Sequence, residues 1–430
     1  MKTSKGIAKR FLENNGLLAD QISFEDVLDD FLEEMELGLT GEESSLAMIP
    51  TFISIENSVP AFKPVIALDA GGTNLRVAAV VFDGDGNSRI SHLTKHKMPG
   101  SDGELNKNEF FDKFVEFLLP FADRADSVGF CFSYPAEISP DRDGRLLAWT
   151  KEIQAPEIVG EFIGKNVFER LARKGHRLKF TILNDTVATL LAGKSVDFEH
   201  KFDTYIGFIL GTGTNTAYIE KNRSITKRRD LDPMGSQAIN TESGNFSKCP
   251  RGPVDREFDK TTETPGQYLF EKMISGAYLG GLCLTALKKA SEAGLFSRHG
   301  AQWISSKEAL STIEVDCILR DPNRAIDDGS REMSADDREI IRHLCAAVCK
   351  RAALFAAINV SAAILKSSGG RSSRPVCVNI DGSVYYKIEG FTRMAEGYLE
   401  KILRPKNISY ELIRVDDSPL IGAAVAGLMC

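Results

Sequence analysis

The sequence predicts an α/β protein with two domains, and three observations support this. The chain has 430 residues, more than the roughly 250–300 residues that one hydrophobic core serves. Apolar runs of four to six residues, typical of buried strands, alternate with longer stretches of helical periodicity. A glycine turn between two apolar runs occurs twice, which indicates a duplicated unit with one copy per domain. Strands that alternate with helices predict a largely parallel sheet.

The first element in chain order is an amphipathic helix over residues 23–37. Ser23 can cap it, with Asp26 three residues later as a capping box, and Gly38 is a natural stop. Strands are expected at the apolar runs, which are residues 65–68, 77–82, 128–132, 180–183, 205–210 and 376–380. The helical stretches expected between them include residues 106–122, 266–294 and 335–366.

Composition and charge argue against several classes of protein. Apolar residues make up 43% of the chain and charged residues 26%, which is ordinary for a globular protein. The net charge of −7 argues against a nucleic-acid-binding face, although backbone amides can still hold an anionic cofactor. No apolar run reaches the ~18 residues that cross a bilayer. The basic N-terminus has no apolar segment behind it, which favours a solvated first helix over a transit peptide.

The eight cysteines are scattered and form no CxxC pair, so the sequence contains neither a zinc knuckle nor a redox motif. Cys345 and Cys349 lie one helical turn apart near His343, which suits either a metal site or the core of a buried helix. The apolar spacing around them favours the core. We expect reduced thiols and a cytoplasmic protein, with no nucleic-acid or membrane partner. The sequence does not indicate the oligomeric state.

Both glycine turns have the chemistry of phosphate-binding loops, because backbone N–H groups at glycine are fixed donors with no side chain in the way. The first turn contains Asp69, Gly71, Gly72, Thr73 and Asn74, followed by Arg76. The second contains Gly211, Thr212, Gly213 and Thr214. Neither has the P-loop or the Rossmann pattern, and either one alone is compatible with an ordinary tight hairpin.

Asp185 is the candidate catalytic base. It follows the run FTIL, at the carboxyl end of an expected strand, where open α/β sheets bind their ligands. Transfer of a phosphoryl group to a hydroxyl needs a carboxylate that accepts the proton and a cation that balances the charge, and Lys151 can supply the cation. Asp185 is also well placed to cap the next helix, so a structural role is the alternative.

The chain as a whole resembles the hexokinase family. The resemblance covers nearly the entire length and is carried by ordered motifs: LDAGGTNLRV, FSYP…LLAWTK, LNDTVATL, GTGTN, INTESGNF, EFD…TPG..LFEKMISG.YLG and NIDGSVY. It implies two actin-like, ribonuclease H-like domains that close over a substrate cleft. The expected small domain, with the first phosphate loop and the catalytic aspartate, is residues 62–187 plus 418–430. The expected large domain, with the second loop, is residues 1–61 plus 188–417.

The resemblance also implies roles for individual residues. Asp185 matches the general base, with Lys151 as its charge partner. The residues that match sugar-binding positions are Ser133, Thr150, Lys151, Asn184, Asp185, Asn215 and Glu242. Those that match the first phosphate loop are Asp69, Gly71, Gly72, Thr73, Asn74 and Arg76, and those of the second are Gly211, Thr212 and Gly213. Gly382 and Ser383 match the adenosine segment, and Asp69 is expected to reach Mg²⁺ through water.

Three positions depart from the family pattern. Gly281 stands where the family usually places a sugar-binding glutamate, and Ser243 stands where a tryptophan is usual. Pro419, with a longer insert, replaces a glycine-rich turn. The first departure predicts weak glucose binding or another preferred hexose. The other two concern local packing and nucleotide affinity.

We therefore expect ATP-dependent phosphorylation of glucose or a related hexose at its 6-hydroxyl, feeding glycolysis, with ATP and Mg²⁺ as cofactors. One alternative is a hexose sensor of the same fold without turnover, and Gly281 is the feature that favours it. The other is a kinase of the same fold that prefers another hexose or an amino sugar. The presence of Asp185, Lys151 and both phosphate turns favours an enzyme over a sensor.

Overall fold

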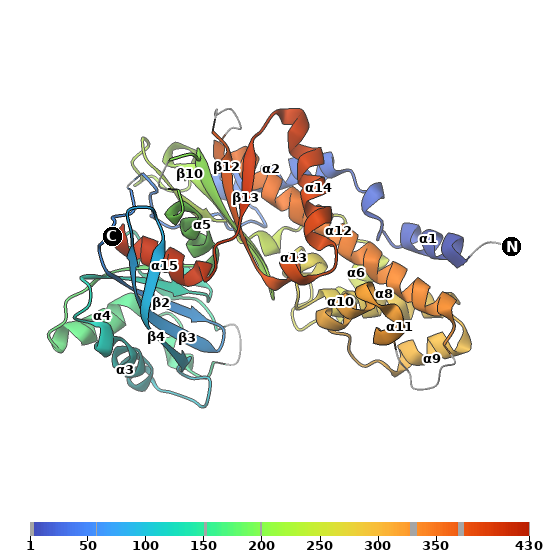
Figure 1. Ribbon diagram of the computed structural model, residues 1–430, viewed down its shortest axis with the longest axis horizontal. Helices are drawn as coiled ribbons and strands as arrows, with labels where there is room; N and C mark the ends of the chain where they lie inside the picture. Colours follow the sequence, from blue (N-terminus) through green and yellow to red (C-terminus); the bar gives the residue numbers. More distant parts are fainter. Residues whose placement is uncertain are drawn as a thin grey trace.

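The computed structural model describes residues 4–56, 58–149, 153–197, 200–326, 333–368 and 374–429. Two large sheets lie in these residues, with helices around them (Figure 1). The first sheet has the order β4-β3-β2-β5-β8, formed by β2 (Val65–Gly71), β3 (Asn74–Phe82), β4 (Ser88–Lys97), β5 (Ser127–Phe132) and β8 (Lys179–Leu183). The second has the order β1-β11-β10-β9-β12-β13, formed by β1 (Ile49–Pro50), β9 (Thr204–Leu210), β10 (Thr214–Lys221), β11 (Ser236–Asn240), β12 (Val376–Asp381) and β13 (Tyr410–Ile413). A small hairpin is formed by β6 (Ala136–Ile138) and β7 (Gly144–Leu146).

The two large sheets repeat one pattern. In the first, β4–β3 and β3–β2 are antiparallel, whereas β2–β5 and β5–β8 are parallel. In the second, β11–β10 and β10–β9 are antiparallel, whereas β9–β12 and β12–β13 are parallel. The duplicated unit is therefore confirmed, and so are all six predicted strands. The expectation of a largely parallel sheet is wrong, because strands joined by short glycine turns must run antiparallel.

Two helices hold corresponding places in the repeated units. Helix α5 (Asp185–Ser195) follows β8, and α15 (Ser418–Leu428) follows β13. They pack against each other, α15 on the first sheet and α5 on the second (Figure 1). Gly422 permits this contact, because a Cβ there would lie 1.8 Å from the Ala188 carbonyl oxygen. One apolar cluster therefore joins the two sheets through these helices.

The other face of each sheet has its own core. On the first sheet, α3 (Lys107–Leu118) and α4 (Ile163–Arg173) cover a cluster rich in phenylalanine. On the second, the long α12 (Ala335–Ser368) packs with α2 (Phe24–Thr40) and α14 (Phe391–Leu403). The remaining α-helices are α1 (Ser4–Asn14), α6 (Pro253–Lys260), α7 (Glu271–Ile274), α8 (Leu279–Glu292), α9 (Arg298–Ser306), α10 (Thr312–Arg320), α11 (Pro322–Ala325) and α13 (Ser383–Lys387).

Helix α12 is, among the described residues, the one helix long and apolar enough to cross a membrane. It is the central helix of a protein core, since 89% of its most apolar window is buried inside the protein. Cys345 and Cys349 are fully buried on it, and their thiols contact Cys283 of α8. The interpretation of these cysteines as core residues is confirmed.

The helix predicted over residues 23–37 is α2, which is longer than expected. Ser23 caps it by accepting the Asp26 N–H at 3.2 Å, as predicted, but the Asp26 side chain does not return a bond to the Ser23 N–H, so the predicted capping box is wrong. Gly38 does not end the helix. It is buried within it, where a Cβ would lie 2.4 Å from a neighbouring carbonyl oxygen. The helix ends instead at Gly41, which has the left-handed φ of +85° that glycine accepts readily.

Candidate active site

The ends of three parallel strands bring distant parts of the chain to one edge of the first sheet. Asp69 of β2 lies opposite Cys131 of β5, which in turn lies opposite Leu183 of β8. Ser133 directly follows β5, and Asp185 stands two residues after Leu183. Because parallel strands present their carboxyl ends at the same edge, three predicted site residues share it.

Asp185 is the first residue of α5 and not its cap. The cap is Asn184, whose side-chain oxygen accepts the Thr186 N–H at 2.9 Å. The alternative that assigned the capping role to Asp185 is therefore wrong. Thr186 Oγ1 donates to Asp185 Oδ1 at 3.2 Å, and a carboxylate in the first turn also interacts favourably with the helix dipole.

Asn215 and Glu242 come from the second sheet and are held together by amide hydrogen bonds. Asn240 Nδ2 donates to Glu242 Oε1 at 2.7 Å, and Asn215 Nδ2 donates to the same oxygen at 3.3 Å. Glu242 has a φ of +56°, a left-handed conformation that is strained for a residue other than glycine. Such strain persists only where the surroundings impose it, and it is concentrated at binding sites. Two of the predicted sugar-binding residues are therefore in contact and rigidly placed.

Glu271 is a further candidate site residue that the sequence motifs alone do not single out. It begins α7, and its Oε2 accepts the Thr214 N–H at 2.8 Å beside the second glycine turn. A Cβ on Gly213 or on Gly244 would lie only 2.6 or 3.2 Å from the Glu271 side chain. The motif LFEKMISG contains this glutamate and is the sequence feature that could have indicated it. One continuous helix was expected there, however, whereas the structure breaks it into α7 and α8, and the break decides where the glutamate points.

Three carboxylates, those of Asp185, Glu242 and Glu271, are close enough to influence one another. Burial raises the pKa of Glu271 to about 6, and the negative charges of Glu242 and Asp185 contribute to the rise. Burial also raises the pKa of Glu242, with the charge of Asp185 as a further cause and the Asn240 and Asn215 amides opposing it. Such a cluster suits an uncharged ligand with several O–H donors better than an anion.

The first glycine turn is tied to the C-terminal helix through an arginine. Arg76 Nε and Nη2 donate to Asp69 Oδ2 at 2.9 and 2.7 Å, and Nη1 donates to Asp417 Oδ1 at 2.5 Å. Asp417 immediately precedes α15. Burial raises the pKa of Asp69, whereas the Arg76 charge opposes the rise. At the turn itself, Gly72 has a φ of +64°, as two-residue hairpin turns that begin with glycine require.

The second glycine turn lies against the predicted adenosine segment. The Gly211 N–H donates to the Gly213 carbonyl at 3.0 Å, and the Gly276 N–H donates to the Gly211 carbonyl at 2.8 Å. A Cβ on Gly211 would lie 3.5 Å from Gly382 Cα, and Gly382 has a φ of +120°. Ser383 follows at the start of α13. Two of the segments predicted to contact ATP therefore adjoin.

Comparisons with known proteins agree with this geometry. The hexokinase family matches the chain over residues 9–195 and 205–429. The chain belongs to the hexokinase family. It is similar to hexokinase-1 of Schizosaccharomyces pombe, with 30% identity over 94% of this chain and 87% of the relative. It is also similar to hexokinase-2 of Oryza sativa subsp. japonica, with 32% identity over 93% of this chain and 86% of the relative.

A solved structure extends the likeness to the fold. The hexokinase of Schistosoma mansoni complexed with glucose superposes with a TM-score of 0.81 and 27% identity, and the match covers 100% of both chains. The two-domain, actin-like α/β fold is therefore confirmed. The reaction class of this family, the ATP-dependent phosphorylation of a hexose, therefore applies to this chain.

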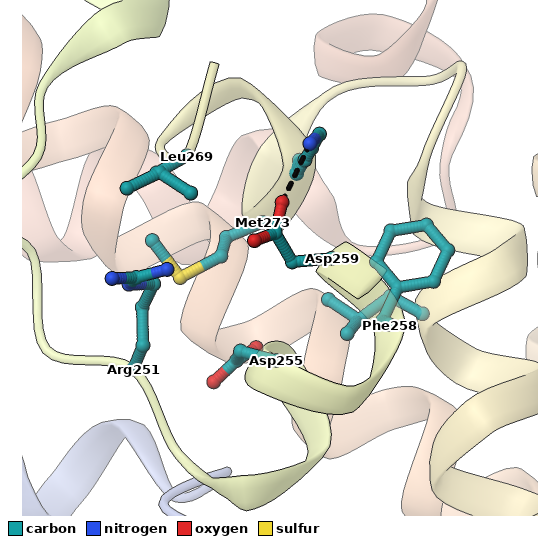
Figure 2. Close-up of a pocket in the computed structure, with 8 residues that line it drawn as sticks. Arg251, Asp255, Phe258, Asp259, Leu269 and Met273 are labelled. Atoms are coloured by element: carbon teal, nitrogen blue, oxygen red, sulfur yellow. Dashed lines mark hydrogen bonds and ion pairs between the residues drawn. The ribbon is translucent and has the colours of Figure 1, made fainter. Parts of the chain in front are cut away.

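Gly281 does not face the carboxylates of this hexokinase, so its interpretation as a missing sugar acceptor is wrong. It lies on α8, where a Cβ would be 2.6 Å from the ring of Phe258. Phe258 lines a cavity of about 10 Å³ (Figure 2), and none of the three carboxylates lines it. That cavity is far smaller than the ~300 Å³ or more of ligand pockets. Because the Glu271 carboxylate lies beside the second glycine turn and near Glu242, Gly281 gives no basis for expecting weak glucose binding.

The same cavity shows how Glu271 is held. The next residue, Lys272, donates to Asp259 Oδ1 at 2.6 Å (dashed in Figure 2) and to the Thr264 carbonyl at 2.6 Å. The Lys272 side chain is only 3% exposed. Removal of one partner of a buried ion pair is strongly destabilising, so this pair anchors α7 firmly to α6.

Four other predicted positions remain. Lys151 and Thr150, the predicted cation and a sugar-binding residue, lie outside the residues that the structure describes. Ser133 donates its N–H to the Ala70 carbonyl at 3.1 Å, and its Oγ lies 3.7 Å from Cys131 Sγ. Pro419 falls in the first two positions of α15, where a missing N–H removes no helical bond, so this departure is compatible with the helix.

Proposed function

We propose that this hexokinase transfers the γ-phosphoryl group of ATP to the 6-hydroxyl of glucose or a related hexose, with Asp185 as the general base. The observation that carries the proposal is the convergence of Asp185, Glu242 and Glu271 from three different elements. An uncharged polyol supplies the O–H donors that such a cluster needs. The two glycine turns supply backbone N–H groups for the phosphates.

The sugar is proposed to bind through four side chains and to be oriented before reaction. Glu242 and Glu271 accept hydroxyl protons in hydrogen bonds, while Asn215 and Asn184 supply further polar groups. Asp185 then accepts the proton of the 6-hydroxyl while the hydroxyl oxygen attacks the γ-phosphorus of ATP in line and ADP leaves. Lys151 is proposed to balance the charge that develops on the transferred group.

The proposed ATP site uses both turns and the segment of Gly382 and Ser383. Asp69 fits a role beside Mg²⁺, because Arg76 takes Oδ2 whereas Oδ1 lies next to Gly71 in the first turn. No three His, Cys, Asp or Glu side chains of the described residues form a metal cage, which agrees with an ion carried mainly by nucleotide phosphates and water. When bound, Mg²⁺ would neutralise charge on the transferred phosphoryl group.

The domain limits of 62–187 plus 418–430 and of 1–61 plus 188–417 remain part of this proposal, as do glycolysis and a cytoplasmic location. The alternative of a sensor without turnover rested on Gly281. Since Glu271 stands beside the second glycine turn and near Glu242, Gly281 no longer favours a sensor.

The test is ADP release from Mg-ATP across a panel of hexoses, with ³¹P NMR of the product to identify the phosphorylated hydroxyl. We expect turnover with glucose and a 6-phosphate ester. Binding of glucose without any ADP release would reject the proposal in favour of a sensor. Turnover only with an amino sugar or another hexose would correct the substrate and keep the reaction.

A further inference from the structure

Three buried polar side chains form a closed ring of hydrogen bonds next to the sugar-binding residues. Thr216 Oγ1 donates to Asn359 Oδ1 at 2.9 Å, and Asn359 Nδ2 donates to Ser243 Oγ at 3.1 Å. The Ser243 and Thr216 hydroxyl oxygens lie 3.3 Å apart. Because the Thr216 proton is already used, Ser243 is the donor of this third bond. All three side chains are at most 1% exposed, so the ring satisfies groups that water cannot reach.

The ring is joined to the sugar-binding residues through the backbone. Thr216 directly follows Asn215, and Ser243 directly follows Glu242. The Thr216 and Ser243 N–H groups both donate to Asn215 Oδ1, at 2.7 and 3.2 Å. With its oxygen held by two donors, the Asn215 amide must direct Nδ2 elsewhere, and Nδ2 donates to Asn240 Oδ1 at 2.7 Å and to Glu242 Oε1.

The third member of the ring comes from the core helix. Asn359 lies on α12, which packs against β10, and successive residues of a strand point to opposite faces. Asn215 is therefore directed away from α12, whereas Thr216 faces it. The ring links the long core helix α12 to the strand that carries Asn215 and to the strained Glu242.

Ser243 stands where the family usually has a tryptophan, and the ring gives that departure a physical meaning. An indole ring occupies volume but offers one donor and no acceptor. Here Ser243 instead accepts a hydrogen bond from Asn359 and bonds to Thr216, and such bonds have a direction. Each bond restricts rotation of a group whose neighbour touches the sugar.

We propose that Asn359, Ser243 and Thr216 are positioning residues that fix Asn215 and Glu242 in the orientation required for the hexose. The inference rests on the proposed function of Asn215 and Glu242 as sugar-binding residues. It assigns no chemical step to the ring. The ring acts on sugar affinity and leaves nucleotide affinity unchanged.

The first test is Asn359→Leu, which keeps approximate volume and removes both hydrogen bonds. We expect the KM for glucose to rise about ten-fold, the effect of one lost buried hydrogen bond, while the KM for ATP stays unchanged. The variant also leaves the buried Thr216 hydroxyl without its acceptor and the Ser243 oxygen without its amide donor, so its melting temperature should fall. This loss of stability makes a second variant necessary.

The triple variant Thr216→Val, Ser243→Ala and Asn359→Leu removes every polar group of the ring together. Replacing all partners by apolar groups of similar shape leaves no unsatisfied group, so stability should recover toward that of the wild type. If the ring positions the site, the KM for glucose stays high although the melting temperature recovers. If the KM recovers together with stability, the ring is only structural and the proposal is wrong.

The matched control is Ser361→Ala on the same helix. The Ser361 hydroxyl is equally buried but has no hydrogen-bond partner in the described part of the chain. Its removal should change neither KM. Asn359→Leu with a wild-type KM for glucose, or with equal rises in both KM values, would overturn the inference. A wild-type protein that phosphorylates no hexose would instead overturn the proposed function, so the two failures are distinguishable.

Discussion

Asp185 and Asp417 hold corresponding places in the two repeated units, yet their surroundings differ. Asp185 is the first residue of the helix that ends its unit, and Asp417 immediately precedes the corresponding helix. Asp185 lies among carboxylates: burial raises the pKa values of Glu242 and Glu271, and the Asp185 charge adds to both rises. Asp417 pairs with Arg76 at 2.5 Å. The repeated fold therefore places the aspartate, whereas the charges around it decide its role.

The largest expected effect separates these two aspartates directly. Asp185→Asn removes the proposed base while keeping the shape, so the turnover number should fall about 10²–10⁴-fold. Asp417→Asn breaks an ion pair whose aspartate is 49% exposed, and exposed pairs contribute about 0–1 kcal/mol, so only a few-fold change in the KM for ATP is expected. Steady-state kinetics on folded proteins checks this, and equal losses of turnover would contradict the comparison.

The next effect concerns Glu271, the acceptor that distinguishes the Asp185 region. Glu271→Gln keeps the volume and removes the charge that accepts a sugar hydroxyl. A hydrogen bond to a charged group contributes about 1.5–3 kcal/mol, so the KM for glucose should rise roughly ten- to hundred-fold. Glu263→Gln, at an exposed glutamate of the preceding loop, is the control. Equal KM values for glucose in Glu271→Gln and Glu263→Gln would contradict the assignment of Glu271 to the sugar site.

Gly281→Glu tests, through protein stability, whether position 281 can hold a sugar-binding glutamate. A side chain there meets the Phe258 ring at 2.6 Å, and overpacking of a core typically costs about 1–3 kcal/mol. We expect a lower free energy of unfolding in urea and no tighter glucose binding. A stable variant with improved glucose affinity would restore the missing-acceptor interpretation.

A pH dependence should follow from the crowded carboxylates. Glu271 has a pKa of about 6 in the folded chain, above its ordinary value of 4.5. Between these two pH values the folded, unliganded protein keeps a proton on Glu271 that the unfolded chain has released. Its contribution to stability therefore falls as pH rises from about 4.5 to 6. The ionised form accepts hydrogen bonds better, so glucose binding should tighten several-fold between pH 5 and 7. Calorimetric titration without ATP checks this, and the same profile in Glu271→Gln would contradict the assignment.

The smallest expected signal is a change of shape. The first turn belongs to one sheet and the second turn to the other, so hexose alone should draw the two units together before ATP binds. Small-angle scattering should give a slightly smaller radius of gyration at saturating glucose. Glu271→Gln at the same glucose concentration should show less of the change. An unchanged wild-type profile at saturation would contradict closure.

Several features could be predicted because they are local. Apolar runs next to glycine turns give strands and hairpins, and each of the six predicted strands is present. Asp185 was identifiable because an acid directly after a buried strand is placed at the carboxyl edge of a sheet by the chain itself. Ser23 was identifiable as a cap because capping involves only the next three residues.

Other features were decided only by the tertiary structure. Gly281 and Glu271 lie in one expected helix, and the rotation that turns Gly281 toward Phe258 depends on the break between α7 and α8. Arg76 meets Asp417 across 341 positions of the chain. Asn359 meets Thr216 across 143. Periodicity shows which face of an element is buried, but not which distant side chain it meets, because that contact depends on how whole elements pack.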